Sequence, residues 1–236
     1  PPTRWQPGPG GAAGLLLDGK AAEVAGVGDF EHDQGFTVSF WVRPPANDNA
    51  YAALAKMDDA QAYRGWDAWI QSRRLGIHMV HAWPDDAFKV SAKDQLPADV
   101  WTRVAIVSDG WGRPEGVKIY YDGKPQGMNV EVNAFKKGTI RNQVPLTIGS
   151  RSPGSPAHGC GVAGVALWGR AFSAGEVEGL VRGGDIANLV RLPAAERPAA
   201  AAGLYDWWLS SADAPFKAAG ERVRALEAET AAIRQR

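Results

Sequence analysis

Aromatic and polar side chains that could hold a hydroxylated ligand gather in the middle of the sequence. The chain has ten tryptophans among 236 residues, and several lie next to carboxylates, amides or a histidine. A tryptophan ring offers a large apolar face, and a few fixed polar atoms beside it can orient a ligand such as a sugar ring. The candidate ligand-binding residues are Trp66, Trp69, His81, Trp83, Asp85, Asp86 and Trp111.

Each aromatic candidate also has a purely structural interpretation. Trp66 could belong to a core, and for Trp83 and Trp111 a surface function and a packing role are equally well supported. His81 follows alternating apolar residues over 75–79 and precedes a Trp-Pro pair. A buried, hydrogen-bonded histidine that orders this turn is therefore a slightly better interpretation than ligand contact.

Paired carboxylates are the other chemistry that the sequence offers. Glycoside hydrolysis needs two carboxyl groups on opposite sides of the scissile bond, about 5 Å apart or more. Asp58-Asp59 and Asp85-Asp86 are neighbours in predicted loops, so their side chains point in opposing directions. A polysaccharide lyase would need a base beside a cation, and parts of one could come from His78, His81, Lys89 and Tyr121. Neither set forms a signature, and we expect the chain not to be an enzyme.

Charge and cysteine content exclude several function classes. Lys plus Arg and Asp plus Glu both number 26, so the formal net charge is zero. The basic excess or stripe that marks a nucleic-acid partner is missing, and an anionic membrane surface is disfavoured for the same reason. One cysteine, Cys160, allows neither an intramolecular disulfide nor a cysteine zinc site. No apolar run reaches the roughly 18 residues of a membrane span.

The elements that position these residues are predicted to be short strands. Apolar and polar residues alternate along most of the chain from Leu15 to Leu167, and turn dipeptides such as Asp18-Gly19 and Asp122-Gly123 separate the runs. Such a pattern predicts a β-sandwich or barrel. Within the predicted strands, Trp41, Trp101 and Trp168 are expected in the core. The expected strands fall near 15–17, 36–42, 66–71, 75–79, 101–107, 117–121, 144–149 and 162–168.

The pattern becomes helical near the C-terminus. Ser173 and Glu176 form a capping box for a short helix, which we expect to end at Gly183-Gly184. A second helix is predicted from an apolar stripe at three-four spacing, made of Phe216, Ala219, Val223, Leu226, Thr230 and Ile233. The predicted organisation is a β-sandwich over 1–184 and a helical tail over 185–236 that packs on the sandwich or leads to a next domain.

Three segments, in order, resemble the laminin G-like branch of the concanavalin A-like lectin/glucanase superfamily. They are Gly14–Pro44, with its strand FTVSFWV, Leu96–Pro125, with YYDG after a tryptophan strand, and Pro145–Leu180, with closing strands and a short helix. The resemblance implies a jelly roll of two antiparallel sheets. We therefore expect an all-β, concanavalin A-like sandwich with a short C-terminal helical extension.

A narrower resemblance concerns Gly65–Ala92 with its His-x-Trp-Pro run, and the segment that begins LYDWW. Both are similar to the version of this domain found in large bacterial multidomain proteins that carry c-type haem domains. This implies an exported parent protein, in the periplasm or at the cell surface, and neighbouring domains of the parent chain as partners.

The sequence departs from the resembled family at two places. Gly161–Val165 has no carboxylate where many members hold a structural calcium ion, so calcium is doubtful, and we expect no other cofactor or metal. The Glu-x-Asp-x-(x)-Glu strand of the family's retaining glycosidases is also missing. The leading hypothesis is a non-catalytic carbohydrate-binding module that tethers a larger exported protein to polysaccharide. A structural or protein-interaction domain is the second hypothesis, and a polysaccharide-degrading enzyme is the third.

Overall fold

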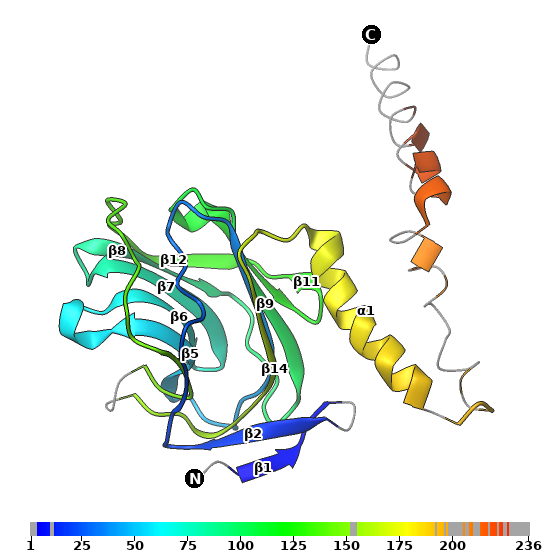
Figure 1. Cartoon of the computed structure of the whole chain (residues 1–236), viewed down its shortest axis with the longest axis horizontal. Helices are drawn as coiled ribbons and strands as arrows, with labels where there is room; N and C mark the ends of the chain where they lie inside the picture. The colour runs from blue at the N-terminus through cyan, green and yellow to red at the C-terminus, as the bar shows by residue number, and fades with distance from the viewer. Residues whose placement is uncertain are drawn as a thin grey trace. The chain divides into compact units, whose positions relative to one another are not determined.

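The first part of the chain folds into two stacked antiparallel sheets of seven strands each (Figure 1). The computed structural model describes residues 4–9, 12–151, 155–191, 193–195, 197, 205, 208–209, 213–216, 218–220, 222–223 and 226. The chain divides into two compact units, Pro1–Glu178 and Gly179–Arg236. The prediction of an all-β, concanavalin A-like sandwich with short C-terminal helices is confirmed.

One sheet, called sheet A, joins both ends of the sandwich sequence. Its strands, in spatial order, are β1 (Arg4–Pro7), β2 (Ala13–Asp18), β14 (His158–Trp168), β4 (Phe36–Arg43), β9 (Thr102–Ser108), β10 (Val117–Tyr121) and β11 (Lys124–Pro125). Strand β14 lies between β2 and β4, so the last strand of the sandwich closes the sheet near its centre.

The other sheet, sheet B, is built mainly from the middle of the sequence. Its strands, in spatial order, are β12 (Met128–Asn133), β8 (Asp86–Ala92), β7 (Arg74–Ala82), β6 (Arg64–Gln71), β5 (Ala50–Asp58), β13 (Leu146–Ile148) and β3 (Ala22–Val24). The strand prediction missed β3, β5, β8 and β12 of this sheet, and β1 and β11 of sheet A. In β5 every residue from Tyr51 to Met57 is buried, so its alanine-rich sequence shows no alternation between an apolar and a polar face.

The core lies between the sheets and is formed by the inward residues of both. Phe36, Val38 and Phe40 of β4 face Ile70 of β6 and other apolar side chains across this space. All four side chains are fully buried, and burial of such a side chain stabilises the fold by about 1.5–3 kcal/mol. The core therefore fixes which residues of sheet B face outward.

Three tryptophans expected in the core lie elsewhere. Trp41, Trp101 and Trp168 are all half-buried, and they do not belong to the buried core cluster. The guanidinium of Arg103 lies over the Trp41 ring at 5.7 Å, and that of Arg43 lies over Trp101 at the same distance. The expectation was wrong for Trp41 because its neighbours Phe40 and Val42 take the core side of β4, which turns Trp41 to the opposite face.

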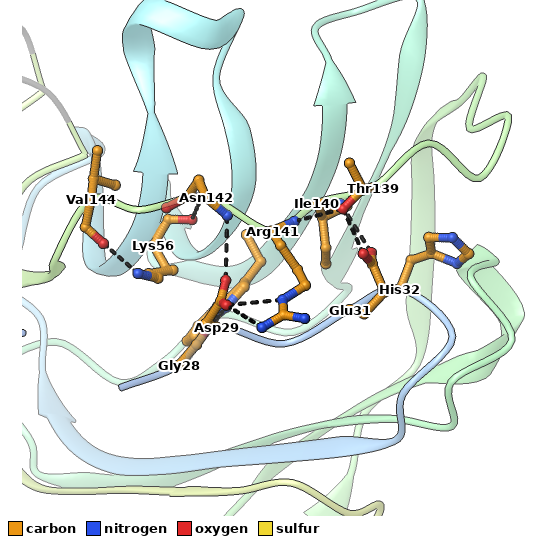
Figure 2. Close-up of polar contacts among 11 residues, drawn as sticks. Gly28, Asp29, Glu31, His32, Lys56, Thr139, Ile140, Arg141, Asn142 and Val144 are labelled. Carbon is orange, nitrogen blue, oxygen red and sulfur yellow. Dashed lines mark hydrogen bonds and ion pairs between the residues drawn. The ribbon is translucent and has the colours of Figure 1, made fainter. Parts of the chain in front are cut away.

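A clamp of hydrogen bonds ties the segment between β12 and β13 to the loop before β4 (Figure 2). The Asp29 carboxylate accepts from Nε and Nη2 of Arg141, at 2.9 and 2.7 Å, and from the backbone N–H of Asn142. The Glu31 carboxylate accepts from the Thr139 hydroxyl and from the Ile140 N–H. We call these six residues the rim clamp, and the clamp joins segments that are more than 100 residues apart in the sequence.

Helix α1 (Ala174–Arg191) follows the last strand and begins at the predicted cap. The Ser173 N–H donates to Glu176 Oε2 at 2.8 Å, which confirms the capping box. The expected end at Gly183-Gly184 is wrong, because the helix continues to Arg191. Each glycine destabilises a helix by only about 1 kcal/mol relative to alanine, and the neighbouring residues offset this cost.

In the second unit, several described residues beyond α1 are helical. Phe216, Val223 and Leu226 of the predicted stripe are helical and about half exposed, whereas Thr230 and Ile233 lie outside the described residues. The rings of Tyr205 and Trp208 stack with centroids 6.2 Å apart. Among the described helices, none has the length and apolarity that crossing a membrane requires.

Candidate functional site

The outer face of sheet B, the face turned away from sheet A, carries the candidate site. Trp66 of β6 packs in the core, and the alternation along the strand therefore turns Asp67 and Trp69 to the outer face. In β7 the same alternation turns Gly76 and His78 outward. Register places Asp67 opposite His78, and Trp69 opposite Gly76.

A buried charge cluster lies at the centre of this face. The fully buried Asp67 carboxylate accepts from the backbone N–H of His78 at 3.0 Å and contacts its Nδ1 at 2.9 Å. The second carboxylate oxygen pairs with Nη1 of Arg151 at 3.2 Å. Burial disfavours the charged carboxylate and, by itself, would raise the pKa of Asp67. The interactions with His78 and Arg151 outweigh this effect, so the pKa of Asp67 lies below its usual value. Asp67 is therefore a charged anchor that holds two side chains in place.

Aromatic rings surround this charge cluster. The Arg151 guanidinium lies over the Trp69 ring, 4.6 Å from its centroid, and over Tyr63 at 5.1 Å. The His78 ring meets Trp69 edge-on at 5.7 Å and Trp83 edge-on at 5.3 Å. His78 thus joins two candidate tryptophans that come from different parts of the β6–β8 meander, and cation–π contact holds Trp69 in a fixed orientation.

Beside this cluster lies a groove of about 420 Å³ across β6, β7, β8 and β12. Trp69, Gly76, Ser91 and Asn129 form one line across the four strands, because each is paired with the next in register. Gly76 has no side chain, so it forms the low floor of the groove in the middle of this line. The groove is lined by Trp69, Gln71, Ser72, Arg74, Gly76, Lys89, Ser91, Lys93, Asn129 and Glu131.

The polar side chains of the groove are ordered by one another. The Lys89 ammonium donates to Gln71 Oε1 at 3.0 Å and pairs with Glu131 at 2.5 Å. The Ser91 hydroxyl donates to the other Glu131 oxygen at 2.6 Å, and the indole N–H of Trp69 donates to Gln71 at 3.2 Å. Partial burial by itself would raise the pKa of Glu131. The ion pair with Lys89 and the hydrogen bond from Ser91 outweigh this effect, so its pKa is lowered. These bonds prearrange donors and acceptors beside an aromatic ring.

The groove also carries more positive than negative charge. Its described lining includes Arg74, Lys89 and Lys93, whereas Glu131 is the one carboxylate among those residues. Lys89 is paired with Glu131, but across the described part of the chain no carboxylate pairs with Arg74 or Lys93. A ligand with hydroxyls and an acidic group matches this arrangement.

Two of the sequence-predicted site residues fall in or beside this arrangement. Trp69 lines the groove with only 9% of its surface exposed. Trp83 lies at the rim of the cluster, 37% exposed, and contacts His78. The candidate residue Asp85 is exposed in the same β7–β8 turn as Trp83.

The other predicted residues have separate locations. Trp66 lies in the core, where its ring stacks with Phe30 and its indole N–H donates to the Gly28 carbonyl. His81 contacts the Thr139 carbonyl through Nδ1 at 2.8 Å, so it is held by the β12–β13 segment and not by the Trp-Pro turn.

Asp86 accepts from the Lys136 N–H at 2.6 Å, so it binds the same β12–β13 segment that His81 contacts. Trp111 is 64% exposed in the β9–β10 loop of sheet A, with Arg113 over its ring at 5.0 Å. His81 and Asp86 therefore position a loop, and Trp111 belongs to a different surface.

Sequence reasoning missed several residues that the structure places at the site. From the sequence, His78 is assigned only to a possible catalytic set, although its position between the core residues Ile77 and Met79 indicates the outer face. Arg151 lies 84 residues from Asp67 in the sequence. Nothing in the sequence pairs it with Trp69. Within the described residues, no group of three or more histidine, cysteine or carboxylate side chains is placed to hold a metal ion.

Comparison with known proteins identifies the fold from sequence and from structure. A sequence model of the concanavalin A-like lectin/glucanases superfamily matches residues 18–178. No curated protein matches the chain. Three similar solved structures are the binding domain of Paraclostridial Mosquitocidal Protein 1, the binding domain of botulinum neurotoxin serotype G, and the serotype D ligand-binding domain in complex with N-acetylneuraminic acid.

These structures share the fold at low sequence identity. The identities are 16, 15 and 12%, and the TM-scores are 0.59, 0.58 and 0.55. They cover 78, 78 and 74% of this chain, but only 46, 45 and 42% of the compared chains. The chain thus spans less than half the length of these binding domains.

Proposed function

Because the chain belongs to the concanavalin A-like lectin/glucanase superfamily, we propose that it is a carbohydrate-binding domain whose ligand occupies the groove on sheet B. The observation that carries the proposal is the prearranged set of Trp69, Gln71, Lys89 and Glu131. Its members supply an aromatic wall, an amide, a cation and a carboxylate within one hollow. Sugar recognition requires such a mixture of apolar area and fixed polar atoms.

The groove supports binding without cleavage. Glycoside hydrolysis requires two carboxyl groups, about 5–5.5 Å apart for retention and about 6.5–9.5 Å for inversion. Glu131 is the one carboxylate in the described lining, and both of its oxygens are held by Lys89 and Ser91. The absence of new reducing ends after long incubation with bound polysaccharide is the expected result, and their release would overturn this part of the proposal.

The binding test uses exposed lining residues, so that folding is preserved. Affinity electrophoresis and a glycan array with neutral and acidic polysaccharides should show retention of the whole chain. Lys93→Ala and Asn129→Ala should weaken retention about tenfold, which corresponds to about 1.4 kcal/mol of binding free energy. No retention of folded protein on any glycan would contradict the proposal.

Matched control variants come from the same sequence. Lys118 is an exposed lysine on sheet A, and Asn133 is an exposed asparagine on β12 outside the groove lining. Lys118→Ala and Asn133→Ala should retain the affinity of the unmodified chain. Equal losses in all four variants would mean that retention does not depend on the groove.

The domain's place in a parent protein is a further part of the proposal. We propose that it tethers a larger exported protein to polysaccharide, as the resemblance of Gly65–Ala92 to domains of bacterial multidomain proteins suggests. Cell fractionation with an antibody against the domain tests export. Recovery of the parent protein only from the cytosol would contradict it.

A further inference from the structure

A second hollow of about 700 Å³ lies over the other half of sheet B. Its lining includes Glu23 of β3, Met57 of β5 and Thr147 of β13, together with Lys20, Ala21 and Arg151 from loops. Its apolar area and its mixture of both charge signs resemble the composition of a sugar site. The groove described above spans β12 to β6, so the two hollows together extend over all seven strands.

Both hollows open on the same face of the sheet. Leu146 belongs to the core, so its neighbour Thr147 is turned to the outer face. Met57 packs with Val80 and Ala87, which are likewise turned away from the core cluster. Both hollows are therefore accessible to a single ligand lying on sheet B.

Strand register joins the two hollows along one row of residues. Glu23 is paired with Thr147, Thr147 with Ala55, and Ala55 with Asp67. The row continues through His78 to Lys89. It makes five steps between neighbouring strands, and at about 4.8 Å a step it covers about 24 Å. This length exceeds that of a single sugar ring and is suited to an extended chain.

A side-chain stack links the linings of the two hollows. Arg151 lines the second hollow, Trp69 lines the groove, and the guanidinium lies 4.6 Å from the centroid of the indole. The Asp67 carboxylate holds this stack from below through its pair with Arg151. The Arg151–Trp69 stack therefore connects a residue of one lining directly with a residue of the other.

We propose that the second hollow is a further subsite for the same ligand, so that the domain binds an extended oligosaccharide that crosses the Arg151–Trp69 stack. This inference rests on the proposed function. The groove binds one end of the bound segment, and the hollow beside Thr147 and Glu23 binds sugar units farther along the chain. Affinity should consequently grow with oligosaccharide length until both hollows are filled.

The test compares short and long oligosaccharides with variants that fill one hollow at a time. Titration calorimetry of the whole chain would use disaccharides through hexasaccharides of the cello-, xylo-, manno- and oligouronate series. Ala21 is exposed at the second hollow and Asn129 at the groove, so tryptophan at either position obstructs one space without disturbing the core. Ala25→Trp, at an exposed loop residue outside both linings, is the matched control.

The expected results distinguish the two subsites. Ala21→Trp should lower hexasaccharide affinity about tenfold, or about 1.4 kcal/mol, and leave disaccharide affinity unchanged. Asn129→Trp should weaken both ligands, and Ala25→Trp should weaken neither. Hexasaccharide binding that is insensitive to Ala21→Trp but lost in Asn129→Trp overturns the second subsite and leaves the proposed function intact. Absence of binding to every oligosaccharide by the unmodified, folded chain overturns both.

Discussion

Asp67 and His78 face each other on neighbouring strands, and the Asp67 carboxylate contacts both the backbone N–H and the ring of His78. The same carboxylate pairs with Arg151, which lies over Trp69. One buried charge therefore determines the position of an imidazole, a guanidinium and, through the guanidinium, the wall of the groove.

Asp67→Asn should destabilise the fold by about 3 kcal/mol, because loss of one partner of a buried ion pair leaves the others without compensation. Urea unfolding followed by tryptophan fluorescence measures this loss. Asp85→Asn is the control, since Asp85 is exposed and a surface change should stay within about 0.5 kcal/mol. Equal effects of the two substitutions would show that the Asp67 charge does not organise the site.

Acid should weaken the fold through the carboxylates whose pKa values are lowered. Asp67 and Glu131 have pKa values below their usual range, where burial is outweighed by cationic and hydrogen-bonding partners. Such groups contribute stability above the unfolded-state pKa, about 4, and this contribution is lost as the pH falls through the folded-state pKa. Urea midpoints measured from pH 6 downward should decrease below about pH 4. Asp67→Asn should show a shallower decrease, and an unchanged slope would contradict the assignment.

Trp69 and Trp111 should respond differently to truncation. Trp69→Ala should cost about 3 kcal/mol, because it removes a buried ring and its contacts with Arg151 and His78. Trp111→Ala should change the unfolding free energy by less than about 0.5 kcal/mol, because that ring is 64% exposed. Chemical denaturation of both variants measures the difference. A Trp69 variant as stable as the Trp111 variant would mean that the Arg151 stack contributes little.

The rim clamp should hold the segment between β12 and β13 in place. Asp29→Asn should lower the free energy of unfolding only slightly, because the Arg141 side chain is 59% exposed and water screens the ion pair. Hydrogen exchange should become faster at residues 139–142, whereas Asp33→Asn in the same loop should leave exchange there unchanged. Unaltered protection in the Asp29 variant would show that the Glu31 contacts alone hold this segment.

The Cys160 thiol should be unreactive in the folded chain. Complete burial raises its pKa to about 12, so the reactive thiolate is scarce at pH 8. A colorimetric thiol reagent should therefore react only after unfolding in urea, with the unfolded chain as the positive control. Rapid labelling under native conditions would show that β14 opens easily.

Sequence patterns predicted the sandwich because strand alternation and turn residues are local signals. The same rule could have separated Trp66 from Trp69, since residues three apart on a strand face opposite sides. It did not place His81, because an irregularity in register between Val80 and Ala82 interrupts the alternation. Arg151 could not be predicted at the site, because its contact with Trp69 depends on how a distant loop crosses the sheet.

The groove floor at Gly76 has a consequence for how this domain can diversify. A Cβ at that position would lie 2.6 Å from the Val90 carbonyl oxygen and 3.2 Å from the Ser91 Cβ, so any other residue forces the backbone to shift. Strand β12, by contrast, is an edge strand with mostly exposed residues, including Asn129 and Glu131. Related domains with new ligand preferences should therefore keep the glycine and vary the edge strand, so that the depth of the groove is inherited while its chemistry evolves.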